Sequence, residues 1–114
     1  MLAITTATSA WLLILASGLL EIVFSVSMKL SDGYTRLVPS VASIGAAIFS
    51  VWLMGLTLKV VPMGTAYAVW AGIGAAGTAI VGMLYFQEPI TVARFSCIGL
   101  IAAGIVGLQL QASE

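Results

Sequence analysis

The chain has 114 residues, of which 61% are hydrophobic and 7% are charged, and its formal net charge is zero. Soluble domains carry about 25% charged residues, so this composition excludes a soluble globular protein and predicts a membrane protein. The neutral charge balance, with no basic tail, also argues against binding to nucleic acid. The single Cys97 excludes an internal disulfide, and we expect it to be a buried apolar side chain.

Charged residues divide the chain into four apolar stretches. Glu21 is the only charge before Lys29. The other uncharged stretches are residues 37–58, 60–87 and 95–113. Stretches of this length cross a bilayer as α-helices, and their continuous apolarity lacks the alternation of a membrane β-barrel. A proline marks the start of each of the last three, at Pro39, Pro62 and Pro89, where a missing backbone N–H costs nothing.

We therefore predict an all-α membrane protein. Residues 1–114 form a single transmembrane domain of four helices, at about 10–29, 38–58, 63–85 and 90–110.

The first predicted helix carries Glu21 in otherwise apolar surroundings. An ionised carboxylate in hydrocarbon costs a few kcal/mol or more, so it needs a cation, a proton or a water-filled cavity. We predict that Glu21 binds an ion or a substrate; the alternative is a structural glutamate bonded to a neighbouring helix. Helical spacing places Gly18 and Phe24 on its face, and Gly18 leaves space beside the carboxylate. Ser17 and Ser25 donate either to the carboxylate or to their own backbone.

The second predicted helix carries a polar stripe of Ser43, Ser50 and Thr57. Such a stripe faces protein or water more often than lipid, and by itself it also fits simple helix packing.

The third predicted helix places Tyr67 and Trp70 on one face, beside a glycine groove. Buried Tyr O–H and Trp N–H groups need partners, and aromatic faces attract organic cations, so we expect both to line a substrate site. Gly72 and Gly74 either lower the barrier to bending, as a conformational hinge, or allow close packing.

The fourth predicted helix contains Gly99, Ala103 and Gly107 at four-residue spacing, with Gly104 on an adjacent face. Small residues let helices approach closely, so we expect this helix to be an oligomer contact.

Four short helices cannot easily enclose a polar cavity around one carboxylate, so we expect a dimer in which two Glu21 side chains face each other. A site that holds either protons or a cation becomes an antiporter if it alternates between the membrane faces. Lys59 lies on one predicted side; Lys29, Arg36 and Arg94 lie on the other. The positive-inside rule therefore orients the chain weakly, and an antiparallel, dual-topology dimer is plausible.

Three stretches resemble the small multidrug resistance transporters. They are Gly18-Leu-Leu-Glu21, Met28-Lys-Leu-Ser-Asp-Gly-Tyr-Thr-Arg-Leu-Val-Pro-Ser40 and Pro62-Met-Gly-Thr-Ala-Tyr-Ala-Val-Trp70. The resemblance extends from about Trp11 to Leu110. It implies an antiparallel homodimer in the bacterial inner membrane that exchanges protons for organic cations. The family's membrane glutamate, helix-two serine, and helix-three tyrosine and tryptophan fall on Glu21, Ser50, Tyr67 and Trp70.

The guanidinium-exporting subtype is the most similar. Its matching stretches are Gly72-Ile-Gly-Ala-Ala-Gly-Thr78, Glu88-Pro89 and Gly104-Ile-Val-Gly-Leu108. The subtype usually has tryptophan at Phe24 and lysine at Gln109. Because phenylalanine donates no N–H, one alternative is a promiscuous exporter of quaternary ammonium and lipophilic cations. The second alternative is a non-transporting or heterodimer-only membrane subunit.

An enzyme is not expected, because the chain has no histidine and no nucleophile–base constellation. We expect no cofactor and no metal. The expected partners are protons, a small organic cation, the lipid bilayer and a second copy of the chain.

Overall fold

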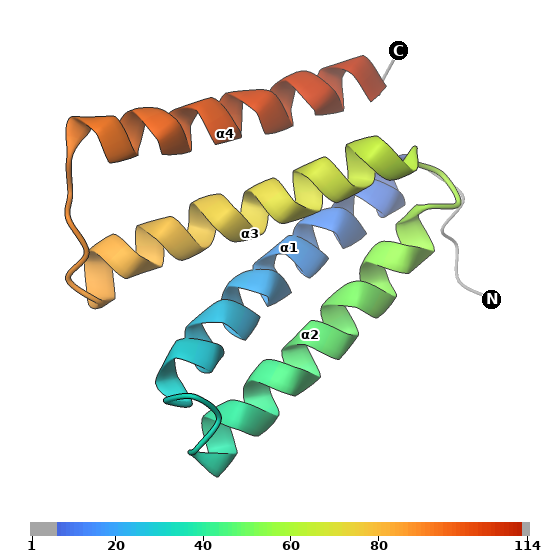
Figure 1. The fold of residues 1–114 in the computed structure, drawn as a ribbon. Coiled ribbons are helices and arrows are strands. Elements are labelled where there is room, and N and C mark those ends of the chain that lie inside the picture. Colours follow the sequence, from blue (N-terminus) through green and yellow to red (C-terminus); the bar gives the residue numbers. More distant parts are fainter. Residues whose placement is uncertain (1–6, 113–114) are drawn as a thin grey trace.

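Four α-helices follow one another along the chain (Figure 1). They are α1 (Ala7–Leu30), α2 (Leu37–Thr57), α3 (Met63–Tyr85) and α4 (Val92–Ala112). This computed structural model describes residues 7–112. All four helices are long and apolar enough to cross a membrane. Lipid offers backbone groups no hydrogen-bond partners, and a helix satisfies them internally. The predicted all-α class with four membrane helices is confirmed.

The helix ends differ slightly from the predicted ranges. Helix α1 begins at Ala7, and α4 begins at Val92, after Pro89. The reason for the second difference is a cap: the Thr91 hydroxyl accepts the Arg94 backbone N–H at 3.1 Å. A threonine in this position satisfies one of the unpaired N–H groups of a helix start, so the helix begins after it.

Helix α1 lies at the centre of the bundle and packs against both α2 and α3. The predicted polar stripe of α2 faces α1 and is fully buried. Ser43 donates to the Phe24 carbonyl oxygen at 3.2 Å, and Ser50 donates to the Ser17 carbonyl oxygen at 2.7 Å. These two hydroxyls therefore join α2 to the backbone of α1, which is the helix-packing role considered for the stripe.

Helix α4 stands apart from this core. Among the described helices it contacts α3 alone, and none of the residues in Val92–Gln111 is buried (Figure 1). Cys97 is exposed, so the expectation that it is buried is wrong for the single chain, because α4 has a neighbour on one side only. A side chain added at Gly99, Gly104 or Gly107 would meet no atom within 4 Å. The small-residue stripe, including Ala103, is thus uncovered, and its role as a dimer contact stays a prediction.

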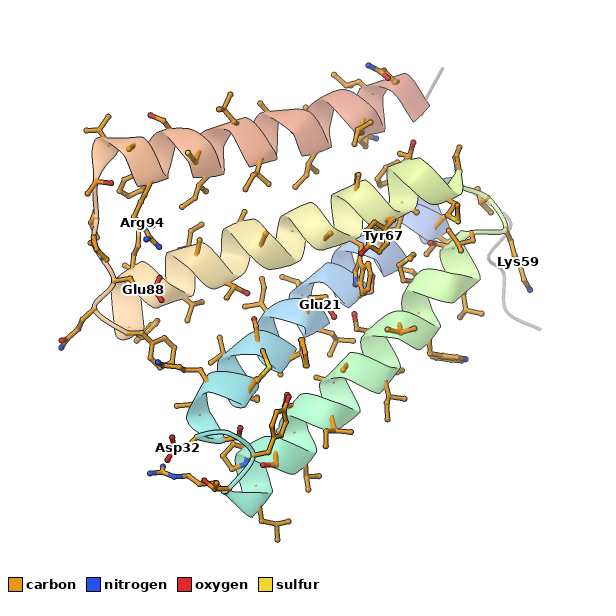
Figure 2. The ribbon with its side chains drawn as sticks, viewed as in Figure 1. Glu21, Asp32, Lys59, Tyr67, Glu88 and Arg94 are labelled. Carbon is orange, nitrogen blue, oxygen red and sulfur yellow. The ribbon has the colours of Figure 1, made fainter. Side chains whose placement is uncertain are left out.

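Charged residues in the loops and in the first turn of α4 lie at the two ends of the bundle. Lys59 lies at the end that holds the α2–α3 connection, while Asp32, Glu88 and Arg94 lie at the other end (Figure 2). Glu21 lies between these ends, partway along α1 (Figure 2). The carboxylate of Glu21 therefore lies within a membrane-spanning helix.

Candidate functional site

Glu21 lines a cavity of about 480 Å³ that α1 and α3 form and that is open to the outside. Its lining residues are Glu21, Phe24 and Ser25 of α1, Ala71, Gly74, Ala75, Thr78 and Ala79 of α3, and Glu88 and Arg94. Three predicted site residues, Glu21, Phe24 and Gly74, thus share one cavity. Gly18, Ser50, Tyr67, Trp70 and Gly72 are not among its lining residues.

Close packing of α1 on α3 holds Glu21 at this cavity. A Cβ atom added at Gly74 would lie 2.9 Å from the Cβ of Glu21, so the two helices touch at this point. One turn earlier on α1, a Cβ atom added at Gly18 would lie 2.7 Å from Cγ2 of Ile73. The space that we expected beside the carboxylate at Gly18 is therefore filled by Ile73 in this conformation.

The glycines of α3 support packing on both of its sides. Gly72 faces α4, where an added Cβ atom would lie 3.1 Å from the Ile105 side chain, whereas Gly74 faces α1. Helix α3 is continuous from Met63 to Tyr85 in this structure. The observed contacts illustrate the close-packing role, and the hinge role of Gly72 and Gly74 stays a prediction.

A hydrogen-bonded chain joins three helices next to the cavity. The Trp70 indole Nε1–H donates to the Ser50 hydroxyl at 2.9 Å, and this hydroxyl donates onward to the Ser17 carbonyl oxygen at 2.7 Å. Tyr67 packs against Trp70 edge to face, with ring centroids 5.4 Å apart. Trp70 lies one helical turn before Gly74, or roughly 6 Å along α3. The aromatic pair therefore lies one to two turns before Gly74 on α3 and does not line the cavity in this structure, while the Ser50 hydroxyl is engaged within the protein.

The serines near Glu21 bond to the backbone. Ser17 donates to the Ile14 carbonyl oxygen at 2.9 Å, and Ser25 lies 3.0 Å from the Glu21 carbonyl oxygen and 2.6 Å from the Thr78 hydroxyl. Of the two roles considered for these serines, the structure shows the backbone role. Within residues 7–112 no hydrogen bond reaches the Glu21 carboxylate, from Tyr67 or from any other side chain. Its oxygens are thus available to a proton or a cation.

Three polar or charged residues of the cavity were missed by sequence reasoning. Thr78 lies one turn beyond Gly74 on the same face of α3, so helical spacing could have found it. Glu88 and Arg94 lie outside α1–α3 and carried no local signal beyond their charge. Arg94 Nη2 donates to Glu88 Oε1 at 2.9 Å, and this ion pair lines the cavity together with Glu21 (Figure 2).

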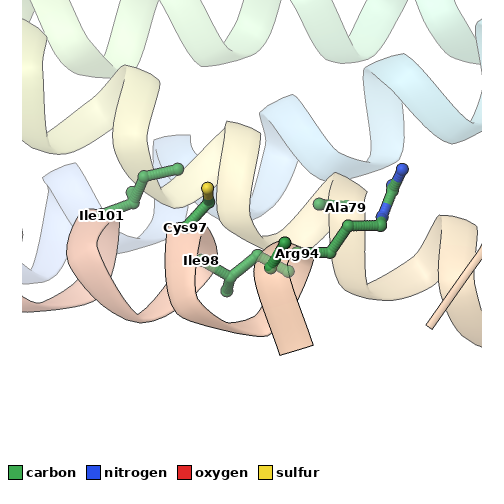
Figure 3. A pocket seen from close by; sticks show the side chains of 6 residues that line it. Ala79, Arg94, Cys97, Ile98 and Ile101 are labelled. Atoms are coloured by element: carbon green, nitrogen blue, oxygen red, sulfur yellow. The ribbon is translucent and has the colours of Figure 1, made fainter. Parts of the chain in front are cut away.

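A second, smaller cavity lies between α3 and α4. Its volume is about 280 Å³, and Cys97, Ile98 and Ile101 of α4 line it together with Ala79 and Arg94 (Figure 3). The Arg94 nitrogens point away from Cys97 and Ile101 in this view (Figure 3). The small cavity is therefore apolar, and the charged end of Arg94 belongs to the cavity of Glu21.

Four helices that can span a membrane, with the membrane carboxylate of Glu21 at a cavity between α1 and α3, are the features of a small multi-pass membrane transporter. Residues 9–101 match the family described as Small Multidrug Resistance protein, and the chain belongs to this family.

Curated relatives support the same class. The chain is 47% identical to a guanidinium exporter of Salmonella typhimurium over 103 residues, which cover 90% of this chain and 98% of the relative. It is 46% identical over 101 residues to guanidinium exporters of Yersinia pseudotuberculosis and Citrobacter freundii, covering 89% of this chain and 97% and 96% of theirs. The relatives are transporters, and the protein is a multi-pass protein of the bacterial inner membrane.

Proposed function

We propose that the protein is a proton-coupled antiporter that exports small organic cations, most of all guanidinium or guanidinyl compounds. The observation that carries the proposal is the Glu21 carboxylate, which lines a cavity between two membrane helices and has no hydrogen-bond partner among the described residues. An acidic side chain in this position is by default an ion or substrate site. The guanidinium exporters among the relatives support the choice of substrate.

The Glu21 carboxylate of each chain can balance one positive charge. A proton and an organic cation therefore compete for Glu21, and the bound species exchanges when the cavity opens to the other face of the membrane. Trp70 and Tyr67 lie one to two helical turns before Gly74 on α3, and their paired rings would add attraction for a cation that reaches them. Proton entry from one side then drives cation exit to that side.

Competition with protons predicts how the KM for guanidinium transport depends on pH. In proteoliposomes, guanidinium efflux should saturate and should accelerate under an inward proton gradient. The KM for guanidinium should rise as pH falls, by up to about tenfold per pH unit, because one proton displaces one cation. A KM that is independent of pH, or efflux that ignores the gradient, would contradict antiport.

A promiscuous exporter of quaternary ammonium and lipophilic cations is the second candidate, and Phe24 is the observation that favours it. This ring lines the cavity beside Glu21 and offers an apolar surface without an N–H donor. The same proteoliposomes therefore receive guanidinium and tetraphenylphosphonium in parallel. Transport of the lipophilic cation without a guanidinium signal would select the second candidate.

The open side of the cavity and the uncovered α4 support an antiparallel homodimer, in which a second copy closes the cavity. Helix α4 has no buried residue over Val92–Gln111, although it is as apolar as a membrane span. Light scattering of the detergent-solubilised protein should therefore give the mass of two chains. A monomer that still binds guanidinium would contradict this arrangement.

A further inference from the structure

The turn after α3 fixes the position of Glu88. Gln87 has a positive φ of 59°, which turns the chain back at the end of the helix. The Glu88 backbone N–H then donates to the Gly82 carbonyl oxygen at 3.1 Å. A Cβ atom added at Gly82 would lie 2.7 Å from Cδ of Glu88, so the carboxylate rests directly on this glycine. The fold thus directs the Glu88 carboxylate onto α3 and towards the cavity of Glu21.

Arg94 brings a positive charge to the same cavity from the first turns of α4. Its guanidinium bonds to Glu88 at 2.9 Å, and the two side chains are 38% and 48% exposed. Ion pairs with this degree of exposure contribute little to folding stability. The pair therefore contributes little to the stability of the fold. Its effect on the cavity is that the charge of Glu88 cancels the charge of Arg94.

Three ionisable side chains line the cavity: Glu21, Glu88 and Arg94. Glu21 contacts α3 at Gly74 and Glu88 contacts it at Gly82, which places them roughly 12 Å apart along the helix at 1.5 Å per residue. Without Glu88, the positive charge of Arg94 would offset the charge of an ionised Glu21 over the whole cavity, and an entering cation would be attracted more weakly. With Glu88 present, the three charges leave the cavity negative.

We propose that Glu88 is a specificity-determining residue that neutralises Arg94, so that the cavity around Glu21 stays negative and admits cations. The proposal rests on the proposed function, because it takes Glu21 as the group that finally binds the cation. Glu88 and Arg94 do not bind the substrate at Glu21; they act on it through their charge.

Coulomb's law sets the size of the effect. A unit charge roughly 12 Å from a bound cation changes its affinity by about two- to tenfold for an effective dielectric constant between about 80 and 20. Glu88→Gln removes a negative charge and should raise the KM for guanidinium by this factor. Arg94→Gln removes a positive charge and should lower the KM by a similar factor. The double variant should reverse most of the change that Glu88→Gln causes.

The experiment compares these three variants with the wild type in proteoliposomes at low ionic strength, and measures guanidinium Kd by calorimetry on the purified proteins. Asp32→Asn is the matched control, since Asp32 lies at the same end of the bundle (Figure 2) but not in the cavity. It should change the KM less than Glu88→Gln does, because Asp32 is farther from Glu21 and outside the cavity. At about 1 M salt, where the screening length is about 3 Å, the differences between variants should shrink.

Opposite shifts of KM in the two single variants support the proposal. A pair that only ties α3 to α4 would give shifts of the same direction in both variants, and that result, or no shift in either, would overturn it. If Glu88→Gln fails to fold, the sign of the shift in Arg94→Gln decides. If Arg94→Gln fails to fold, the salt dependence decides: a raised KM in Glu88→Gln that persists at about 1 M salt would overturn the proposal. A wild-type protein that binds no cation would overturn the proposed function as well, whereas binding through Glu21 without the opposite shifts would overturn this inference alone.

Discussion

Glu21→Gln is expected to reduce proton-coupled guanidinium transport to the leak of protein-free liposomes. Glutamine keeps the size of the side chain but cannot ionise, so it neither binds a proton nor balances a cation. Removing one partner of a buried charge pair costs about 2–5 kcal/mol, so guanidinium affinity should fall by about 30-fold or more. Efflux under an inward proton gradient and calorimetric titration with guanidinium measure the two losses.

The structure predicts that this variant still folds. Glu21 contacts α3 through its Cβ atom at Gly74, and no hydrogen bond within residues 7–112 depends on its carboxylate. The helical content and the elution volume in detergent should therefore match those of the wild type. Glu21→Asp, which keeps a titrating group, should retain part of the proton coupling. Gradient-driven efflux in a folded Glu21→Gln variant would rule out Glu21 as the coupling site.

The four spans and the importance of Glu21 followed from the sequence because their signals are local. Charges and prolines mark the ends of the apolar runs, and one carboxylate in such a run is conspicuous. Phe24 shares the cavity with Glu21 since both lie on one face of α1, three residues apart. Helical spacing alone therefore sufficed for this part of the site.

Other parts of the site depend on contacts between helices, which the sequence does not encode locally. Trp70 donates to Ser50, and Ser50 donates to α1, so the polar groups expected to face a substrate are engaged with one another. Glu88 reaches the cavity because Gln87 reverses the chain and Gly82 has no side chain. A glutamine with a positive φ, such as Gln87, is uncommon, and the composition of the chain does not predict it.

Gly74→Ala is expected to lower guanidinium transport by about 10- to 100-fold, because displacing a binding group by about 1 Å is costly. The added methyl group would lie 2.9 Å from Glu21 Cβ, which is well inside ordinary van der Waals contact. Glu21 Cβ is next to the backbone and cannot swing away, so α1 and α3 must separate. Overpacking of this kind costs about 1–3 kcal/mol, and the melting temperature should fall as well.

Gly64→Ala is the matched control on the same helix. An added Cβ atom there meets nothing within 4 Å, and alanine favours a helix by up to about 1 kcal/mol over glycine. This variant should transport like the wild type and melt no lower, whereas wild-type transport in Gly74→Ala would show that the tight contact is absent from the transporting conformation. The same measurements separate the two roles of Gly74. A displaced Glu21 weakens guanidinium binding and raises Kd, while a stiffened hinge slows the alternation between faces, lowering kcat with Kd unchanged.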